Sequence, residues 1–124
     1  MEIKESSQMY LETIYILSQK SDTVRKIDVS KYMGFAKPSV TRGISLLVER
    51  GFVSVDDSGN ITLTPKGNKE AKSVYERHTI LTKMFTNLGV DEKTAAEDAC
   101  RVEHYISDAT FQAVKRHMEQ YEQS

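Results

Sequence analysis

Hydrophobic residues recur at helical spacing along most of the chain, and the first such run predicts a helix over residues 6–19. Within it, Tyr10, Ile14 and Leu17 lie three or four positions apart, so that one face of the helix is apolar. A helix with one apolar face must pack against other elements to form a core. This first helix is therefore expected to lie inside a folded domain.

Two shorter segments follow, and together they predict a helix-turn-helix. Residues 24–27 are expected to be extended, and Asp28 is expected to cap a brief helix that ends at Gly34. After the connector 35–37, Pro38 suits the first position of a new helix, because its missing N–H would have no partner there in any case. Two helices joined by so short a turn are typical of the helix-turn-helix.

The helix predicted from Pro38 has an apolar and a polar face. Val40, Ile44 and Leu47 share the apolar face. The opposite side is small, polar and basic near its N-terminus, as a helix that enters the major groove of DNA requires. We expect base edges to be contacted by Ser39, Thr41 and Arg42, next to Pro38, and a phosphate by Lys37.

A β-hairpin is predicted immediately after this helix. Gly51 ends the helix, and residues 52–55 and 60–63 are expected to form two strands around a turn at 56–59. A helix-turn-helix followed by a hairpin is a winged helix. Because the tip of this wing is acidic, Lys66, just beyond the second strand, is the candidate for a phosphate contact there.

The second half of the chain predicts three more helices. Thr64 caps a long helix that runs to Gly89, Asp91 caps a helix through His104, and Ser107 caps the last one. The last helix has an apolar face that requires a partner, which a second copy of the chain would supply. That face consists of Phe111, Val114, Met118 and Tyr121.

These elements predict a mainly α protein with a small β-hairpin. A winged helix-turn-helix DNA-binding domain is expected over residues 1–70, and an all-helical dimerisation domain over residues 71–124.

Charge is distributed unevenly along the chain, although the formal net charge is only −1. Between residues 20 and 50, lysine and arginine outnumber aspartate and glutamate by seven to three, whereas from residue 91 onward the acidic residues lead by eight to four. The basic stretch coincides with the predicted DNA-reading segment, and the acidic one suits a cation. A single cysteine excludes an intrachain disulfide, and no secretory or membrane-spanning segment is apparent, so we expect a cytoplasmic protein without a membrane partner.

One cluster carries candidate chemistry. Cys100, Glu103 and His104 are spaced i, i+3 and i+4, which places them on one face of a helix. A thiolate, a carboxylate and an imidazole are ligands that a borderline divalent transition ion prefers. A fourth ligand must come from elsewhere, and the first helix offers Met9 and Glu12, which are one turn apart.

At these positions the chain resembles the diphtheria toxin repressor family of metal-dependent transcriptional regulators, also called the DtxR/MntR family. The resemblance covers nearly the whole chain and is most specific in the segment that contains the cysteine. The matching segments are MYLETIY at 9–15, PSVT at 38–41, LTPKG at 63–67, GVD at 89–91 and DACRVEH at 98–104.

The resemblance implies a metal site of the iron-responsive type, formed by Met9, Cys100, Glu103 and His104. Manganese-responsive relatives have aspartate in place of this methionine and glutamate in place of this cysteine. Sulfur at both positions favours Fe2+ over Mn2+, because Mn2+ prefers oxygen and stands lowest in the affinity series. In vitro, Co2+, Ni2+ or Zn2+ should bind as well.

A second metal site is also implied, in altered form. His78 matches a ligand of both branches, but Thr82 and Ala96 stand where the iron branch has its other two ligands. Glu12 matches a ligand of the manganese branch, so that Glu12, His78 and Glu103 are candidates to hold a second, bridged ion. His78 also lies on an apolar stripe and is equally well interpreted as a core histidine.

The function implied by the resemblance is that of an Fe2+-responsive repressor. Such a protein binds palindromic operator DNA as a homodimer and controls metal-uptake genes, with the ion as corepressor. Many iron-type relatives continue into an SH3-like third domain, whereas this sequence ends at Ser124, so a short form is expected.

Two other classes of protein compete with this interpretation. A winged-helix regulator without a metal would respond to an organic ligand or to oxidation of Cys100. An enzyme would use Cys100 as nucleophile and His104 as base, but no orienting group or oxyanion site is identifiable, so we expect no enzymatic activity.

Overall fold

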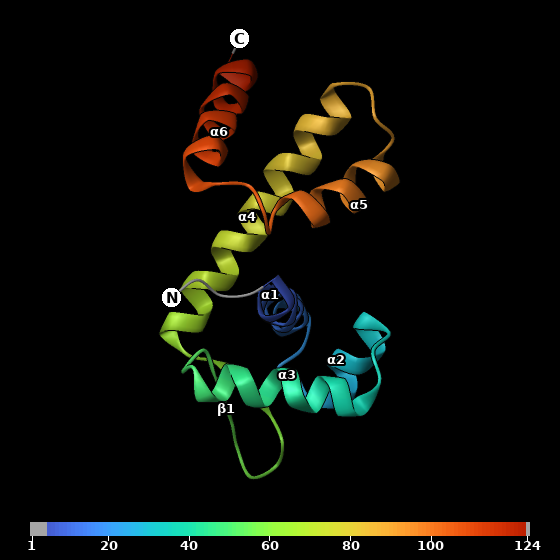
Figure 1. The fold of residues 1–124 in the computed structure, drawn as a ribbon, viewed down its shortest axis with the longest axis vertical. Coiled ribbons are helices and arrows are strands. Elements are labelled where there is room, and N and C mark those ends of the chain that lie inside the picture. Colours follow the sequence, from blue (N-terminus) through green and yellow to red (C-terminus); the bar gives the residue numbers. More distant parts are fainter. Residues whose placement is uncertain (1–4, 124) are drawn as a thin grey trace. The chain divides into compact units, whose positions relative to one another are not determined.

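The computed structural model describes the backbone of residues 5–123 and the side chains of residues 6–120. The described elements are α1 (Glu5–Lys20), α2 (Lys26–Met33), α3 (Lys37–Glu49), β1 (Val53–Val55), β2 (Ile61–Leu63), α4 (Pro65–Asn87), α5 (Glu92–Val102) and α6 (Asp108–Gln123) (Figure 1). The chain divides into two units, with the boundary between Lys72 and Ser73. The predicted fold class, a winged helix-turn-helix followed by helices, is confirmed.

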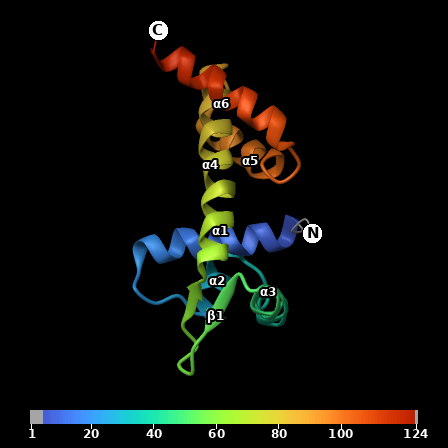
Figure 2. The same ribbon diagram turned by 90° about the vertical axis from the view of Figure 1, so that its left-hand side faces the viewer.

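The first unit is built around one hydrophobic core. Helices α1 and α3 cross: α1 is seen end-on in Figure 1, where α3 lies across the view, and the reverse holds in Figure 2. The apolar faces predicted for both helices point inward, apart from Leu17, which is only partly buried. The buried core comprises Tyr10, Leu11, Ile14, Val24, Val29, Val40, Ile44, Leu47, Phe52, Val53, Ile61 and Ala71.

Both helices of the helix-turn-helix begin one or more residues earlier than predicted. Helix α2 starts at Lys26, so Asp28 lies inside the first turn, where its Oδ2 accepts a hydrogen bond of 2.9 Å from the amide of Arg25. Asp28 therefore gives the free amide at the start of α2 a hydrogen-bond acceptor from the third helical position, rather than from the cap position. Similarly, Pro38 occupies the second position of α3, where an amide would also lack an intrahelical partner.

The wing is a two-stranded antiparallel sheet with Val53 paired to Leu63. In its turn, Asp56 Oδ1 accepts hydrogen bonds from the Ser58 hydroxyl at 2.7 Å and from the amides of Ser58 and Asn60. These bonds, led by that of the hydroxyl, hold the pKa of Asp56 below its ordinary value. The acidic tip is thus an ordered turn that stabilises itself.

The second unit contains the later part of α4 together with α5 and α6. Asp91 and Ser107 cap α5 and α6 as predicted: Asp91 Oδ2 accepts from the Thr94 amide at 3.0 Å, which lowers the pKa of Asp91, and Ser107 Oγ accepts from the Thr110 amide at 3.1 Å. The predicted extent of the long helix, to Gly89, was wrong. Helix α4 ends at Asn87, so Leu88 lies beyond the helix and is 75% exposed.

The apolar face of α6 is already partly covered within the chain. Phe111 and Met118 are buried, whereas Val114 is half-buried, and the side chain of Tyr121 lies outside the described residues. A second copy is therefore not needed to bury the first two. In the described part of the chain, no helix is both long and apolar enough to cross a lipid bilayer.

Candidate metal centre and DNA-reading surface

Three potential metal ligands converge at the end of α5. One ligand atom from each of Cys100, Glu103 and His104 lies within 4.8 Å of the other two. Helix α5 ends at Val102, earlier than predicted, but Glu103 follows with right-handed helical dihedrals (φ −58°, ψ −25°). The predicted helical spacing therefore still brings the three side chains together.

The carboxylate of Glu103 lies at the centre of this cluster and is fully buried. Its Oε2 is 3.0 Å from His78 Nδ1. Its Oε1 is 3.3 Å from His104 Nε2, yet it accepts no hydrogen bond from any described residue. A buried carboxylate oxygen without a hydrogen bond is costly, whereas coordination of a cation satisfies it. The donor set and this oxygen both fit a divalent metal ion.

The structure brings His78 to Glu103, as the second predicted site requires. The Thr82 hydroxyl donates a hydrogen bond of 2.7 Å to the main-chain carbonyl of His78, so this side chain is engaged within α4 itself. The remaining predicted ligands, Met9 and Glu12, belong to α1 of the first unit, where both are half-buried. Their part in metal binding stays a prediction.

Arg77 is a residue that the sequence analysis missed. Its Nη1 donates to the carbonyl oxygens of Ile106 at 3.1 Å and Glu103 at 3.4 Å, and its Nη2 lies 3.6 Å from Asp108 Oδ1. The guanidinium also lies 5.4 Å from the ring centroid of Phe111. No local pattern marks such a residue, because all of its partners are at least 26 positions away.

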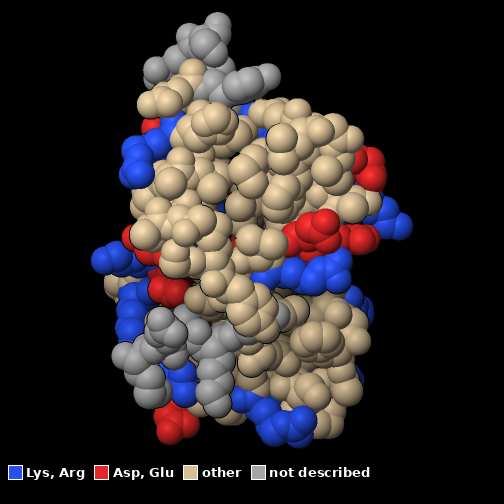
Figure 3. Space-filling view, turned by 45° about the horizontal axis from the view of Figure 1, so that its top comes forward, with Lys and Arg blue, Asp and Glu red and all other residues tan. Residues whose placement is uncertain are grey.

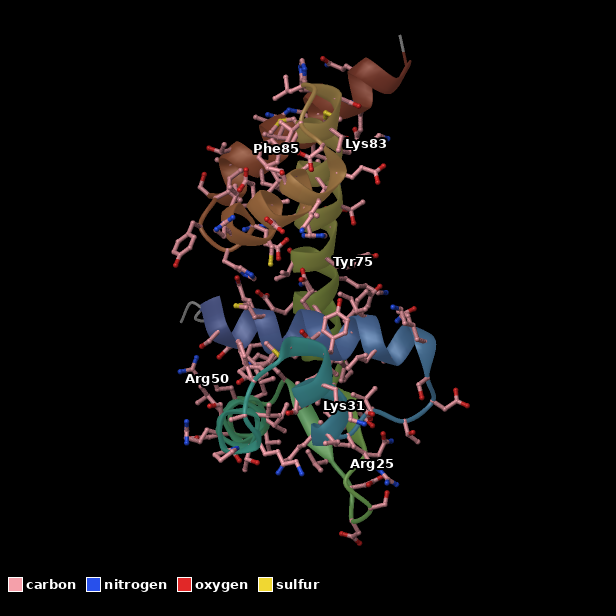
Figure 4. All side chains as sticks on the ribbon, turned by 90° about the vertical axis from the view of Figure 1, so that its right-hand side faces the viewer. Arg25, Lys31, Arg50, Tyr75, Lys83 and Phe85 are labelled. Atoms are coloured by element: carbon pink, nitrogen blue, oxygen red, sulfur yellow. The ribbon has the colours of Figure 1, made fainter. Side chains whose placement is uncertain are left out.

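The predicted DNA-reading residues lie at the start of α3. Lys37, Pro38, Thr41 and Arg42 are exposed, whereas Ser39 is half-buried. Arg42 Nη2 is 3.4 Å from Ser39 Oγ, so the guanidinium lies over the first turn of the helix. Other basic residues of the helix-turn-helix, Arg25 before α2, Lys31 on α2 and Arg50 after α3, are labelled in Figure 4.

Lys66, the predicted phosphate contact of the wing, also has structural contacts. Its Nζ donates to the Arg50 carbonyl at 2.9 Å and lies 4.5 Å from the centroid of the Phe52 ring. Thr64, two residues before, accepts from the Gly67 amide at 3.1 Å and so caps α4 as predicted. The two contacts of Lys66 join the start of α4 to the segment that follows α3.

Tyr10 is a second residue that the sequence analysis did not single out as part of a site. Its hydroxyl donates to the Ser39 carbonyl at 3.2 Å, and its ring meets that of Phe35 edge-on at 6.1 Å. Burial raises the pKa of Tyr10, and the charge of Arg42 opposes this rise. The only local signal was Gly43 inside a helix, where glycine often marks a close approach of two elements.

Neither sign of charge dominates the face of the molecule that Figure 3 shows. On the face drawn in Figure 3, basic and acidic side chains are both present, and neither covers the face. With a formal net charge of −1, attraction of a polyanion must therefore depend on local groups such as those of α3.

A winged helix with an exposed, basic helix N-terminus, followed by a helical unit with a thiol–carboxylate–imidazole cluster, defines a DNA-binding regulator with a divalent metal site. Comparison with known families agrees with this class. Residues 2–60 match the N-terminal DNA binding domain of the iron dependent repressors, and residues 64–124 match their metal binding and dimerisation domain. The chain therefore belongs to the DtxR/MntR family of metal-dependent transcriptional repressors, which are regulators and not enzymes.

Several known proteins match this chain over most of its length. An uncharacterized HTH-type transcriptional regulator of Methanocaldococcus jannaschii is 34% identical over 96% of this chain and 97% of its own length. The transcriptional regulator MntR of Salmonella typhimurium is 32% identical over 84% of this chain and 66% of its own length. Among solved structures, a manganese-dependent transcriptional repressor in complex with manganese matches with a TM-score of 0.84 at 25% identity, over 91% of this chain and 52% of that one.

Proposed function

We propose that this repressor responds to Fe2+ and binds it through Met9, Cys100, Glu103 and His104. The observation that supports this proposal most directly is the cysteine thiol, which converges with Glu103 and His104 to within 4.8 Å. Thiolate and thioether ligands favour Fe2+ over Mn2+, which prefers oxygen and binds most weakly in the divalent series. The manganese-dependent relative has the same fold. What sets this chain apart from the manganese branch is the pair of sulfur donors, Met9 and Cys100.

We further propose a second metal site, for which Glu103 would be a ligand as it is for the first. One carboxylate oxygen of Glu103 lies beside His104 and the other beside His78, so the residue contacts candidate ligands of both sites. Glu12 is the remaining ligand that we assign to the second ion. A carboxylate binds a metal ion in its deprotonated form, so Glu12 and Glu103 would each bring a negative charge that balances part of the charge of the cations.

On DNA, we assign base contacts to Ser39, Thr41 and Arg42 and phosphate contacts to Lys37 and Lys66. Pro38 lies in the first turn of the same helix, where an amide would have no intrahelical partner. A homodimer would place two such helices in successive major grooves, roughly 34 Å apart, on a palindromic operator. Genes of metal uptake are the targets that match an iron-activated repressor.

The ligands of the first site come from α1 and from the end of α5, which belong to different units. When bound, the ion supplies coordinate bonds that favour one arrangement of the DNA-reading and dimerising units. A ligand that binds one arrangement better than the others shifts the population toward it. We propose that this arrangement is the one that fits the two half-sites of the operator.

An anaerobic titration tests the choice of metal. Fe2+ or Mn2+ is added to the metal-free protein while fluorescence anisotropy follows binding to a palindromic duplex selected from random DNA. Fe2+ is expected to activate binding at much lower concentration than Mn2+. His104→Ala is expected to abolish activation, whereas the matched control His117→Ala, an exposed histidine of α6, is expected to retain it.

A cysteine variant separates the metal ligand from a redox sensor. Cys100→Glu is expected to shift the preference toward Mn2+, because it replaces sulfur with oxygen. Chelation is expected to release the DNA, and Fe2+ under reducing conditions to restore binding. Equal DNA binding with and without metal, or release by oxidation alone, would contradict the proposal.

A further inference from the structure

We propose that Arg77 is a positioning residue for the metal centre and ties the turn that carries Glu103 and His104 to the start of α6. This inference rests on the proposed metal site. Arg77 itself donates hydrogen bonds to main-chain oxygens and is not a ligand. Its side chain is only 17% exposed, so its charge is held in place by protein groups rather than by solvent.

Consecutive residues of α4 hold the same glutamate in two different ways. Arg77 donates to the main-chain carbonyl of Glu103 at 3.4 Å, while His78 meets the carboxylate of Glu103 at 3.0 Å. The backbone and the side chain of this residue are therefore both fixed from α4. Because Glu103 is central to the ligand cluster, its position decides where the neighbouring His104 can lie.

Arg77 also places its positive charge beside the C-terminal end of α5. The last carbonyl groups of a helix have no intrahelical partner and carry a partial negative charge. The guanidinium serves the turn after α5 through two carbonyls, those of Glu103 and Ile106, and it brings a positive charge to this helix end. Its planar fork lets Nη1 donate to both carbonyls while Nη2 faces Asp108, a division of contacts that the single ammonium of lysine reproduces poorly.

The same guanidinium reaches α6. It lies 3.6 Å from Asp108, the first residue of that helix, and 5.4 Å from the ring centroid of Phe111. Phe111 is buried, so this contact lies in the interior of the second unit. Arg77 thus connects the backbone of the candidate metal centre with the helix that follows it.

Groups that orient metal ligands typically contribute 10- to 100-fold to metal affinity. We therefore expect Arg77→Met to weaken Co2+ binding by roughly that factor and to change the Co2+ absorption bands, which report ligand geometry. Arg77→Lys keeps the charge but loses the fork, and is expected to lie between Arg77→Met and wild type. The measurement is an anaerobic Co2+ titration followed by visible absorption.

The control is Glu76→Gln. It removes the exposed contact of Glu76 with Lys115 at 3.3 Å, which joins α4 to α6 without touching the ligand turn. It is expected to keep the wild-type Co2+ affinity and spectrum. Circular dichroism of the metal-free variants shows whether each is folded, and Arg77→Lys carries the test if Arg77→Met is not.

The outcomes separate this inference from the proposed function. Wild-type affinity and spectrum in both Arg77 variants, or an equal loss in Glu76→Gln, would overturn the positioning role. Failure of the wild-type protein to bind Co2+ would overturn the proposed metal site, and the inference with it.

Discussion

At the scale of single residues, Tyr10 and Gly43 set the packing of α1 against α3. A Cβ added at Gly43 would lie 2.6 Å from Cζ of the Tyr10 ring, closer than real side chains approach. The Tyr10 hydroxyl at the same time donates to the Ser39 carbonyl, beside the residues assigned to base contacts. Helix α1, which carries Met9, is thereby joined directly to α3, the helix that we propose reads DNA.

We predict that Gly43→Ala lowers the free energy of unfolding by about 1–3 kcal/mol, the usual cost of overpacking a core. It should also weaken DNA binding, because the start of α3 is displaced. Denaturant unfolding and anisotropy with operator DNA measure the two effects. In a Tyr10→Ala background the added methyl group has room, so the penalty for Gly43→Ala should shrink; an unchanged penalty would show that the ring is not its cause.

At the scale of elements, the wing is joined to its neighbours through the first turn of α4. Lys66 donates to the Arg50 carbonyl, which lies at the end of α3, and stacks on Phe52, which precedes β1. An ammonium group has three donors, so two remain for a phosphate after this bond. Lys66 can therefore support the fold and contact DNA at once, whereas Lys37 is simply exposed.

This difference makes a prediction about salt dependence. Lys37→Ala and Lys66→Ala should each reduce the slope of log Kobs against log salt concentration by about one, as expected for the loss of one phosphate contact. Only Lys66→Ala should also lower the free energy of unfolding. Binding measured over a salt series, together with chemical unfolding, tests both parts. An unchanged slope for Lys66→Ala would restrict that residue to its structural role.

At the scale of the whole molecule, the chain consists of two units that we expect to share one metal ion. The second unit holds three converging candidate ligands, and the first holds the predicted fourth. A ligand that binds only the folded protein stabilises it by RT ln(1 + [L]/Kd). Metal is therefore expected to affect stability and DNA binding together.

We predict that Fe2+ at 100 times its Kd raises the free energy of unfolding by about 2.7 kcal/mol. Removal of the ion by a chelator should reverse the gain and release operator DNA. Cys100→Ala should show neither effect at the same Fe2+ concentration. Anaerobic unfolding with and without metal measures the change, and a gain that persists in Cys100→Ala would place the ion elsewhere.

Local patterns were sufficient to predict the elements and part of the candidate site. The caps at Asp91 and Ser107 and the convergence of Cys100 with Glu103 and His104 depend on residues three or four positions apart, so short-range spacing decides them. The errors were also local: Asp28 was assigned to the cap instead of the third position, and Leu88 to a helix that ends one residue earlier.

The groups that orient these residues depend on contacts between distant segments. Arg77 meets carbonyl oxygens 26 and 29 positions away, and Tyr10 meets one 29 positions away. Such partners are chosen by how the helices pack, which no spacing along the chain records. The sequence by itself determined the fold class and the kinds of candidate ligand available, whereas the tertiary structure decided which distant side chains bind the main chain beside those candidate ligands and at the start of α3, because such contacts depend on how the helices pack.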